Sequence, residues 1–86
     1  MKKKWVKLED RTTEIAKCEV LFENGLKENG FNILGFRWYS EKTEYLIEKD
    51  GITLTAIHYR GKANKKIIEA QIKWVTDCFE LKKKLN

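Results

Sequence analysis

Apolar residues recur at helical spacing near the start of the chain. Between Thr12 and Asn29 they fall three and four residues apart and form one stripe, Ile15, Cys18, Phe22 and Leu26. This spacing predicts a helix with Thr12 or Thr13 as its N-cap, since a threonine hydroxyl can accept a first-turn N–H. The pair Asn29-Gly30 should end the helix, because glycine readily adopts the left-handed conformation that follows a last turn.

The same stretch also fits a strand. Ala16, Cys18, Val20 and Phe22 alternate with Lys17, Glu19, Leu21 and Glu23, and Asn24-Gly25 is a typical hairpin turn. We favour the helix because Leu26 continues the helical stripe beyond Gly25.

Residues 31–60 alternate in the manner of three short strands. The run FNILGFRWY (31–39) would place Leu34, Phe36 and Trp38 on one face, and it is followed by KTEYLIE (42–48) and ITLTAIHYR (52–60). Asp50-Gly51 predicts a tight type I′ turn between the last two runs, because both residues tolerate a positive φ. The connection SEKT (40–43) is too short for anything but a second antiparallel pairing.

A long helix should follow from Asn64 to about Leu85. Its core stripe is Ile68, Ile72, Val75 and Phe79, and a second apolar stripe of Ile67, Trp74, Cys78 and Leu81 lies beside it. The combined face is wider than packing on one small sheet requires, so the second stripe meets either the first helix or another chain. Ile67, Trp74 and Leu81 are therefore candidate contacts in a homodimer or with a partner protein.

These elements predict one α+β domain over residues 1–86, with a three-stranded antiparallel sheet packed against two helices. A chain of 86 residues has room for a single modest core. The basic ends, residues 1–7 and 82–86, are expected to be frayed. No apolar run is long enough for a transmembrane helix or a signal peptide, which favours a cytoplasmic protein without membrane contact.

Positive charge gathers at both ends of the sequence. The formal net charge is +5, with +4 in residues 1–7, −4 in residues 8–50, none in residues 51–59 and +5 in residues 60–86. Such asymmetry favours a surface that binds anions.

The stretch GKANKKIIEA (61–70) places Lys62, Lys65 and Lys66 at the start of the last helix, directly after Arg60. Helix N-termini carry free N–H groups and partial positive charge, so lysines there repel the helix end unless an anion lies between them. A nucleic-acid phosphate would satisfy this arrangement, with Lys2, Lys3 and Lys4 as further contacts. A solvated, lysine-rich surface is the alternative.

The order helix, three antiparallel strands, helix resembles the double-stranded-RNA-binding domain. In that family, lysines at the start of the second helix hold phosphates across a groove, and the resemblance assigns this role to Lys62, Lys65 and Lys66. The chain departs from the family in having Ile68, Ile72 and Trp74 where small residues are usual. It also has SEKT in place of the Gly-Pro-His pattern that enters the minor groove.

The open face of the predicted sheet offers another interface. Arg37, Tyr39, Thr53, Thr55 and Tyr59 would lie on the side away from the helices, where aromatic rings next to arginine can stack on single-stranded bases.

Catalytic and metal-binding patterns are weak. His58 is the only histidine and is expected to be a satisfied, half-buried strand residue, Cys18 and Cys78 to be buried thiols, and no cofactor or metal is expected. The sequence thus favours a non-catalytic nucleic-acid-binding protein. The competing interpretation is a small interaction protein, of the type that phages and mobile elements encode, which docks on a host protein as an inhibitor or regulator.

Overall fold

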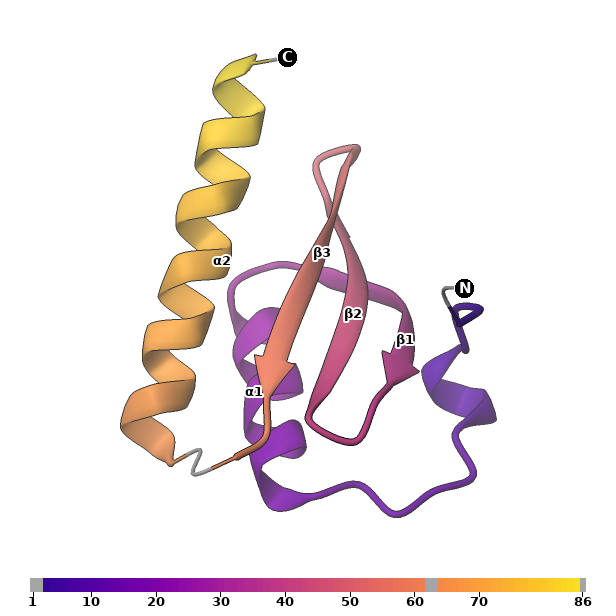
Figure 1. Cartoon of the computed structure of the whole chain (residues 1–86). Helices are drawn as coiled ribbons and strands as arrows, with labels where there is room; N and C mark the ends of the chain where they lie inside the picture. Colours follow the sequence, from indigo (N-terminus) through magenta and orange to yellow (C-terminus); the bar gives the residue numbers. More distant parts are fainter. Residues whose placement is uncertain (1–2, 62–63, 86) are drawn as a thin grey trace.

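The chain folds in the order helix, three strands, helix, with a short N-terminal segment in front (Figure 1), which confirms the predicted α+β class. The computed structural model describes residues 3–61 and 64–85. The elements are a 3₁₀ turn η1 (Leu8–Asp10), α1 (Lys17–Glu28), β1 (Asn32–Trp38), β2 (Lys42–Lys49), β3 (Ile52–Tyr59) and α2 (Lys65–Leu85).

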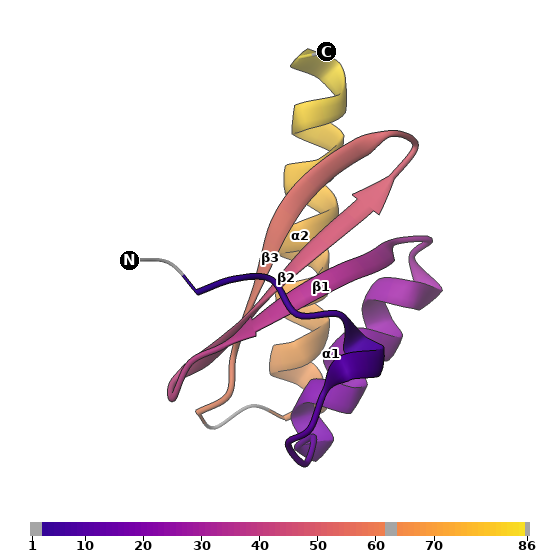
Figure 2. The same cartoon turned by 90° about the vertical axis from the view of Figure 1, so that its right-hand side faces the viewer.

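The three strands form one antiparallel sheet in the order β1-β2-β3. Both helices cover one face of this sheet, α2 beside β3 and α1 closer to β1, and the last turns of α2 extend past the β2–β3 turn (Figures 1 and 2). The core lies between these layers. Its buried apolar residues are Phe22, Leu26, Phe31, Phe36, Tyr45, Ile47, Ala56, Ile68, Ile72, Val75 and Phe79.

The first segment, for which the sequence allowed either a helix or a strand, is the helix α1, but it begins later than the predicted N-cap at Thr12 or Thr13. Ala16 is the N-cap, and the Glu19 carboxylate accepts a hydrogen bond from the Ala16 N–H at 3.3 Å. Thr12 and Thr13 precede α1 because Arg11 is anchored to Glu23 of that helix at 2.7 Å, and an extended stretch carries the chain from this anchor to the helix start.

The predicted end of α1 is confirmed. Gly30 has a φ of 86°, its N–H bonds the Lys27 carbonyl at 3.0 Å, and the Phe31 N–H bonds the Leu26 carbonyl at 3.0 Å. These two bonds define a Schellman motif, and the buried side chains of Leu26 and Phe31 complete it.

The turn between β2 and β3 also follows the sequence. Asp50 has a φ of 53° and Gly51 a φ of 78°, as a type I′ turn requires. The two strands pair without interruption from Lys42 opposite Tyr59 to Lys49 opposite Ile52.

The predicted common face of Leu34, Phe36 and Trp38 is wrong at Leu34. The pairing of β1 with β2 shifts between Ile33 and Gly35, so Leu34 is an extra residue in a bulge. Phe36 remains buried, but Leu34 turns to solvent. At a bulge, the alternation of inward-facing and outward-facing side chains shifts by one residue, and a strict period of two in the sequence does not predict this shift.

Residues 3–7 are not frayed. The Val6 N–H bonds the Phe36 carbonyl at 2.9 Å and the Phe36 N–H bonds the Val6 carbonyl at 2.7 Å, so this segment pairs with the outer edge of β1. Gly35 permits the close approach, because a Cβ there would lie 3.1 Å from the Val6 oxygen. The other predicted frayed end, from Lys82 to Leu85, is helical.

A polar layer lies between α1 and the sheet. Tyr45 donates a hydrogen bond to Glu23 at 2.7 Å and Thr43 donates one to Glu19 at 2.8 Å, and both carboxylates are buried. Arg11 completes the Glu23 site through its 2.7 Å ion pair. Buried charges persist only when they are paired in this way, so the layer fixes how α1 sits on the sheet.

Candidate nucleic-acid interface

The start of α2 carries its own cap. Asn64 Oδ1 accepts a hydrogen bond from the Ile67 N–H at 3.0 Å, as an N-cap residue does. Lys65 and Lys66 are exposed in the first turn, as predicted, while Lys62 lies outside the described residues. The capping side chain satisfies one first-turn donor, so this helix end depends less on an external anion than its lysines suggest.

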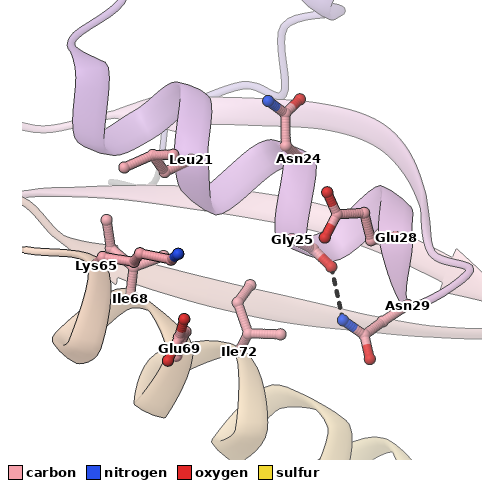
Figure 3. Close-up of a pocket in the computed structure, with 9 residues that line it drawn as sticks. All are labelled: Leu21, Asn24, Gly25, Glu28, Asn29, Lys65, Ile68, Glu69 and Ile72. Carbon is pink, nitrogen blue, oxygen red and sulfur yellow. Dashed lines mark hydrogen bonds between the residues drawn. The ribbon is translucent and has the colours of Figure 1, made fainter.

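Lys65 borders a groove between the two helices (Figure 3). The groove has a volume of about 400 Å³, and its acidic lining residues are Glu28 of α1 and Glu69 of α2. Gly25 and Ile72 also line it and lie so close that a Cβ on the glycine would come within 2.9 Å of the Ile72 Cγ1. Two carboxylates therefore offset the charge of Lys65, which makes the groove a poor phosphate site.

Arg60 is not free at the surface. Its side chain is 14% exposed and lies 4.0 Å from Glu19, and its guanidinium bonds the Thr43 hydroxyl. The same guanidinium stacks 4.4 Å from the ring of Trp38. Arg60 thus closes one end of the polar layer and supports Trp38, a role that its position before the lysines did not suggest.

Lys3 and Lys4 lie at the opposite edge of the sheet from α2. The paired N-terminal segment runs along β1, whereas α2 runs along β3 (Figure 1). Lys3 reaches the end of β1, where its Nζ donates a hydrogen bond to the Trp38 carbonyl at 2.6 Å. Lys2 lies outside the described residues. The predicted single basic end is therefore divided between two edges of the sheet.

Aromatic rings and cations meet where β1 ends, β2 begins and β3 ends. The Nζ of Lys3 lies 4.9 Å from the centre of the Tyr39 ring and that of Lys42 lies 5.4 Å from it. Tyr59 is directly opposite Lys42 in the sheet and is 54% exposed. We call the group Lys3, Trp38, Tyr39, Lys42 and Tyr59 the basic–aromatic end.

Two members of the basic–aromatic end, Tyr39 and Tyr59, were predicted as stacking residues. Their predicted neighbour Arg37 is instead buried, with its guanidinium 3.8 Å from the Trp5 ring and 2.8 Å from Glu44. The N-terminal segment thus covers this part of the open face. Trp38 was not predicted as a stacking residue, because the alternation placed it on the face of Phe36; at the end of the strand it is 44% exposed.

The second apolar stripe of α2 remains exposed. The first stripe, Ile68, Ile72, Val75 and Phe79, is buried as predicted. Ile67, Trp74 and Leu81 face solvent, and Trp74 is 59% exposed. Since α1 packs against other residues of α2, this stripe has no cover from the described part of its own chain.

His58 is more deeply buried than expected. Its ring stacks on Phe22 with centroids 4.8 Å apart, and Nδ1 lies 2.7 Å from Gln71 Oε1. Nε2 has no hydrogen-bond partner among the described residues. Burial lowers the pKa of this imidazole below its ordinary value.

Both cysteines are half-buried thiols.

Residues 3–61 and 64–85 contain no group of three or more His, Cys, Asp or Glu side chains placed to hold a metal ion. Within the same residues, no helix is both long enough and apolar enough to cross a membrane. The chain matches no family model, no curated protein and no solved structure.

Proposed function

We propose that the protein binds nucleic acid without catalysis, and that the basic–aromatic end contacts a single strand. The observation that carries this proposal is that the ammonium groups of Lys3 and Lys42 lie 4.9 and 5.4 Å from the centre of the Tyr39 ring, with Tyr59 exposed next to Lys42. Ammonium groups can neutralise successive phosphates while the rings stack on bases.

The exposed aromatic rings favour a single strand over a duplex. A duplex presents its phosphates but hides the faces of its bases, so exposed rings contribute little to binding it. Trp38 and Tyr59 have large exposed areas at a strand end, where unstacked bases can reach them. Among the residues that the structure describes, no side-chain set suited to reading base edges accompanies them, so binding should be tolerant of sequence.

The start of α2 supports the proposal less well. Lys65 and Lys66 are exposed, but Asn64 already caps the helix and Glu28 and Glu69 border the adjacent groove. We therefore assign these lysines an auxiliary, long-range electrostatic role.

Fluorescence anisotropy with labelled single strands, duplex DNA and duplex RNA tests the proposal. We expect single strands to bind most tightly and affinity to fall with salt. Tyr59→Ala should weaken binding about tenfold, since one stacking contact contributes about 1–3 kcal/mol. Lys42→Gln should also weaken binding and reduce its salt dependence, whereas Lys84→Gln, the same change at the far end of α2, should do neither.

These variants distinguish where nucleic acid binds from whether it binds at all. If Lys65→Glu with Lys66→Glu abolishes binding and Tyr59→Ala does not, the interface lies at the start of α2. If no strand binds at low salt, the nucleic-acid proposal is wrong.

A second candidate function is docking on another protein through α2. It is favoured by Trp74, Ile67 and Leu81, which are exposed along one side of the helix. Because Trp74 is 59% exposed, Trp74→Ala should leave stability within about 0.5 kcal/mol of the parent and still remove the largest apolar contact. Sedimentation velocity of the parent and Trp74→Ala would detect self-association and its loss.

A further inference from the structure

A hollow lies between the N-terminal segment and β1, next to the basic–aromatic end. The backbone pairing of Val6 with Phe36 holds the segment against the strand, and the chain then turns through η1 and continues to α1 (Figure 2). Its volume is about 380 Å³. This is within the range of small-molecule sites and is too small for a duplex. We call it the N-terminal pocket.

The lining of the N-terminal pocket is strongly cationic. Lys3, Lys4, Arg11 and Arg37 line it, against the single acid Asp10. Glu23 and Glu44 pair with the two arginines and hold them in place, while no carboxylate of the described residues pairs with Lys4. The pocket therefore retains positive charge that an anion can neutralise.

Arg11 of the N-terminal pocket has an unsatisfied hydrogen-bond donor among the described residues. One guanidinium nitrogen, NH2, bonds Glu23 at 2.7 Å, whereas the buried Nε has no hydrogen-bond partner within the described part of the chain. An unpartnered buried donor is costly, and a shift of the Arg11 side chain that brought Nε to an oxygen of a bound anion would remove that cost. The exposed residues Thr12 and Thr13 line the same pocket, and a threonine hydroxyl can donate to such an anion.

The other lining groups are apolar, and two of the three are aromatic. Phe36 and Trp38 form part of the wall, and Arg11 lies 4.9 Å from the centre of the Phe36 ring. An inorganic anion would use only the cations and an apolar ligand only the rings. A planar base that carries a phosphate uses both, because aromatic side chains stack on bases and guanidinium groups bond phosphate oxygens.

We infer that the N-terminal pocket binds one phosphate-bearing nucleotide. Lys3 and Trp38 belong both to the pocket and to the basic–aromatic end, so a nucleotide of a bound strand can enter it while its neighbours stack on Tyr39 and Tyr59. This inference extends the proposed function, and it rests on that function insofar as the nucleotide belongs to a bound single strand. A free nucleotide offers the same chemistry, and the experiment distinguishes the two sources.

The test uses the full chain labelled with ¹⁵N and titrated with adenosine 5′-monophosphate, adenosine, inorganic phosphate and a short single strand. We expect the monophosphate to shift the amide signals of residues 4–13 and 36–38, and adenosine or phosphate alone to bind more weakly. Lys4→Glu should weaken monophosphate binding about tenfold, as the loss of one charge-assisted contact predicts. Lys84→Glu, the matched change on α2, should leave it unchanged.

Thr13→Val provides a second variant that leaves the Arg11–Glu23 pair intact. If neither Lys4→Glu nor Thr13→Val alters monophosphate binding, or if the shifts fall elsewhere, the pocket assignment is wrong. Strand binding that still depends on Tyr59 would then preserve the proposed function. Monophosphate binding in the pocket without any strand binding would instead support a free-nucleotide site and refute the strand proposal.

Discussion

Replacing Tyr45 with phenylalanine tests whether the polar layer stabilises the fold. The ring is fully buried against Phe22, and the only group lost is the hydroxyl that donates to Glu23 at 2.7 Å. A hydrogen bond to a charged group contributes about 1.5–3 kcal/mol. We therefore expect Tyr45→Phe to lower the free energy of unfolding by about 2 kcal/mol, because Glu23 is left with Arg11 alone.

Urea unfolding followed by far-ultraviolet circular dichroism measures this change. A loss of about 2 kcal/mol corresponds to a fall in Tm of roughly 8–16 °C for a domain of this size. Tyr59→Phe is the matched control, since it removes the same atom from an exposed ring and should change stability by less than about 0.5 kcal/mol. Equal effects of the two substitutions would refute the reasoning.

A double-mutant cycle locates the effect. If the hydroxyl acts through Glu23, then Tyr45→Phe should cost much less in a Glu23→Gln background than in the parent. Burial, followed by the bond to Glu23, raises the pKa of Tyr45 far above its ordinary value. A raised pKa in the folded state means that this stabilisation is complete below about pH 10 and is lost as the pH rises further. Tyr45→Phe should remove that alkaline loss.

Three further predictions follow from individual contacts. Gly25→Ala gains about 1 kcal/mol of helix propensity but places a Cβ 2.9 Å from Ile72, so we expect a net loss of about 1 kcal/mol that reverses in an Ile72→Ala background. The lowered pKa of His58 means that the unfolded state binds its proton first, so stability should fall as the pH drops below about 6.5. Nuclear magnetic resonance titration of this single imidazole measures the pKa directly. Asn64→Ala should cost about 1 kcal/mol and speed hydrogen exchange in the first turn of α2.

Each of these three has a contradicting result. Stabilisation by Gly25→Ala in the parent would show that the helices separate at no cost. A His58 pKa at or above the ordinary value would show that the ring is hydrated. Unchanged exchange in Asn64→Ala would show that the cap bond adds nothing at that helix end.

Local chemistry explains what the sequence could predict. Asp50-Gly51 and Asn29-Gly30 adopt the predicted conformations because a positive φ depends on the residue type itself. The buried stripe of α2 was predictable for a similar reason, since helical spacing alone places Ile68 and Phe79 on one face.

Contacts between distant segments explain what it could not. The late start of α1 depends on Arg11 reaching Glu23, and the bulge at Leu34 appears only in the pairing of β1 with β2. Periodicity within one element contains no information about either contact.

The candidate site was only partly predictable for the same reason. Lys3, Tyr39 and Tyr59 were named from their residue types, but their assembly with Lys42 depends on which strand ends coincide. Arg60 was predicted as a nucleic-acid contact because it lies directly before the lysines in the sequence. Its position beside Thr43 and Trp38 arises from the register of β3 on β2, which fixes where the side chain points.

The pairing of Val6 with Phe36 has a consequence for solubility. Without residues 3–7, the N–H and C=O groups of Phe36 would be unpaired at the outer edge of the sheet, with exposed Leu34 two residues away on the same strand. Such an edge is a template for pairing with another chain. The lysine-rich segment therefore protects this edge strand from pairing. Its positive charges repel a second copy of the chain that approaches the edge, where aggregation by strand pairing would otherwise begin.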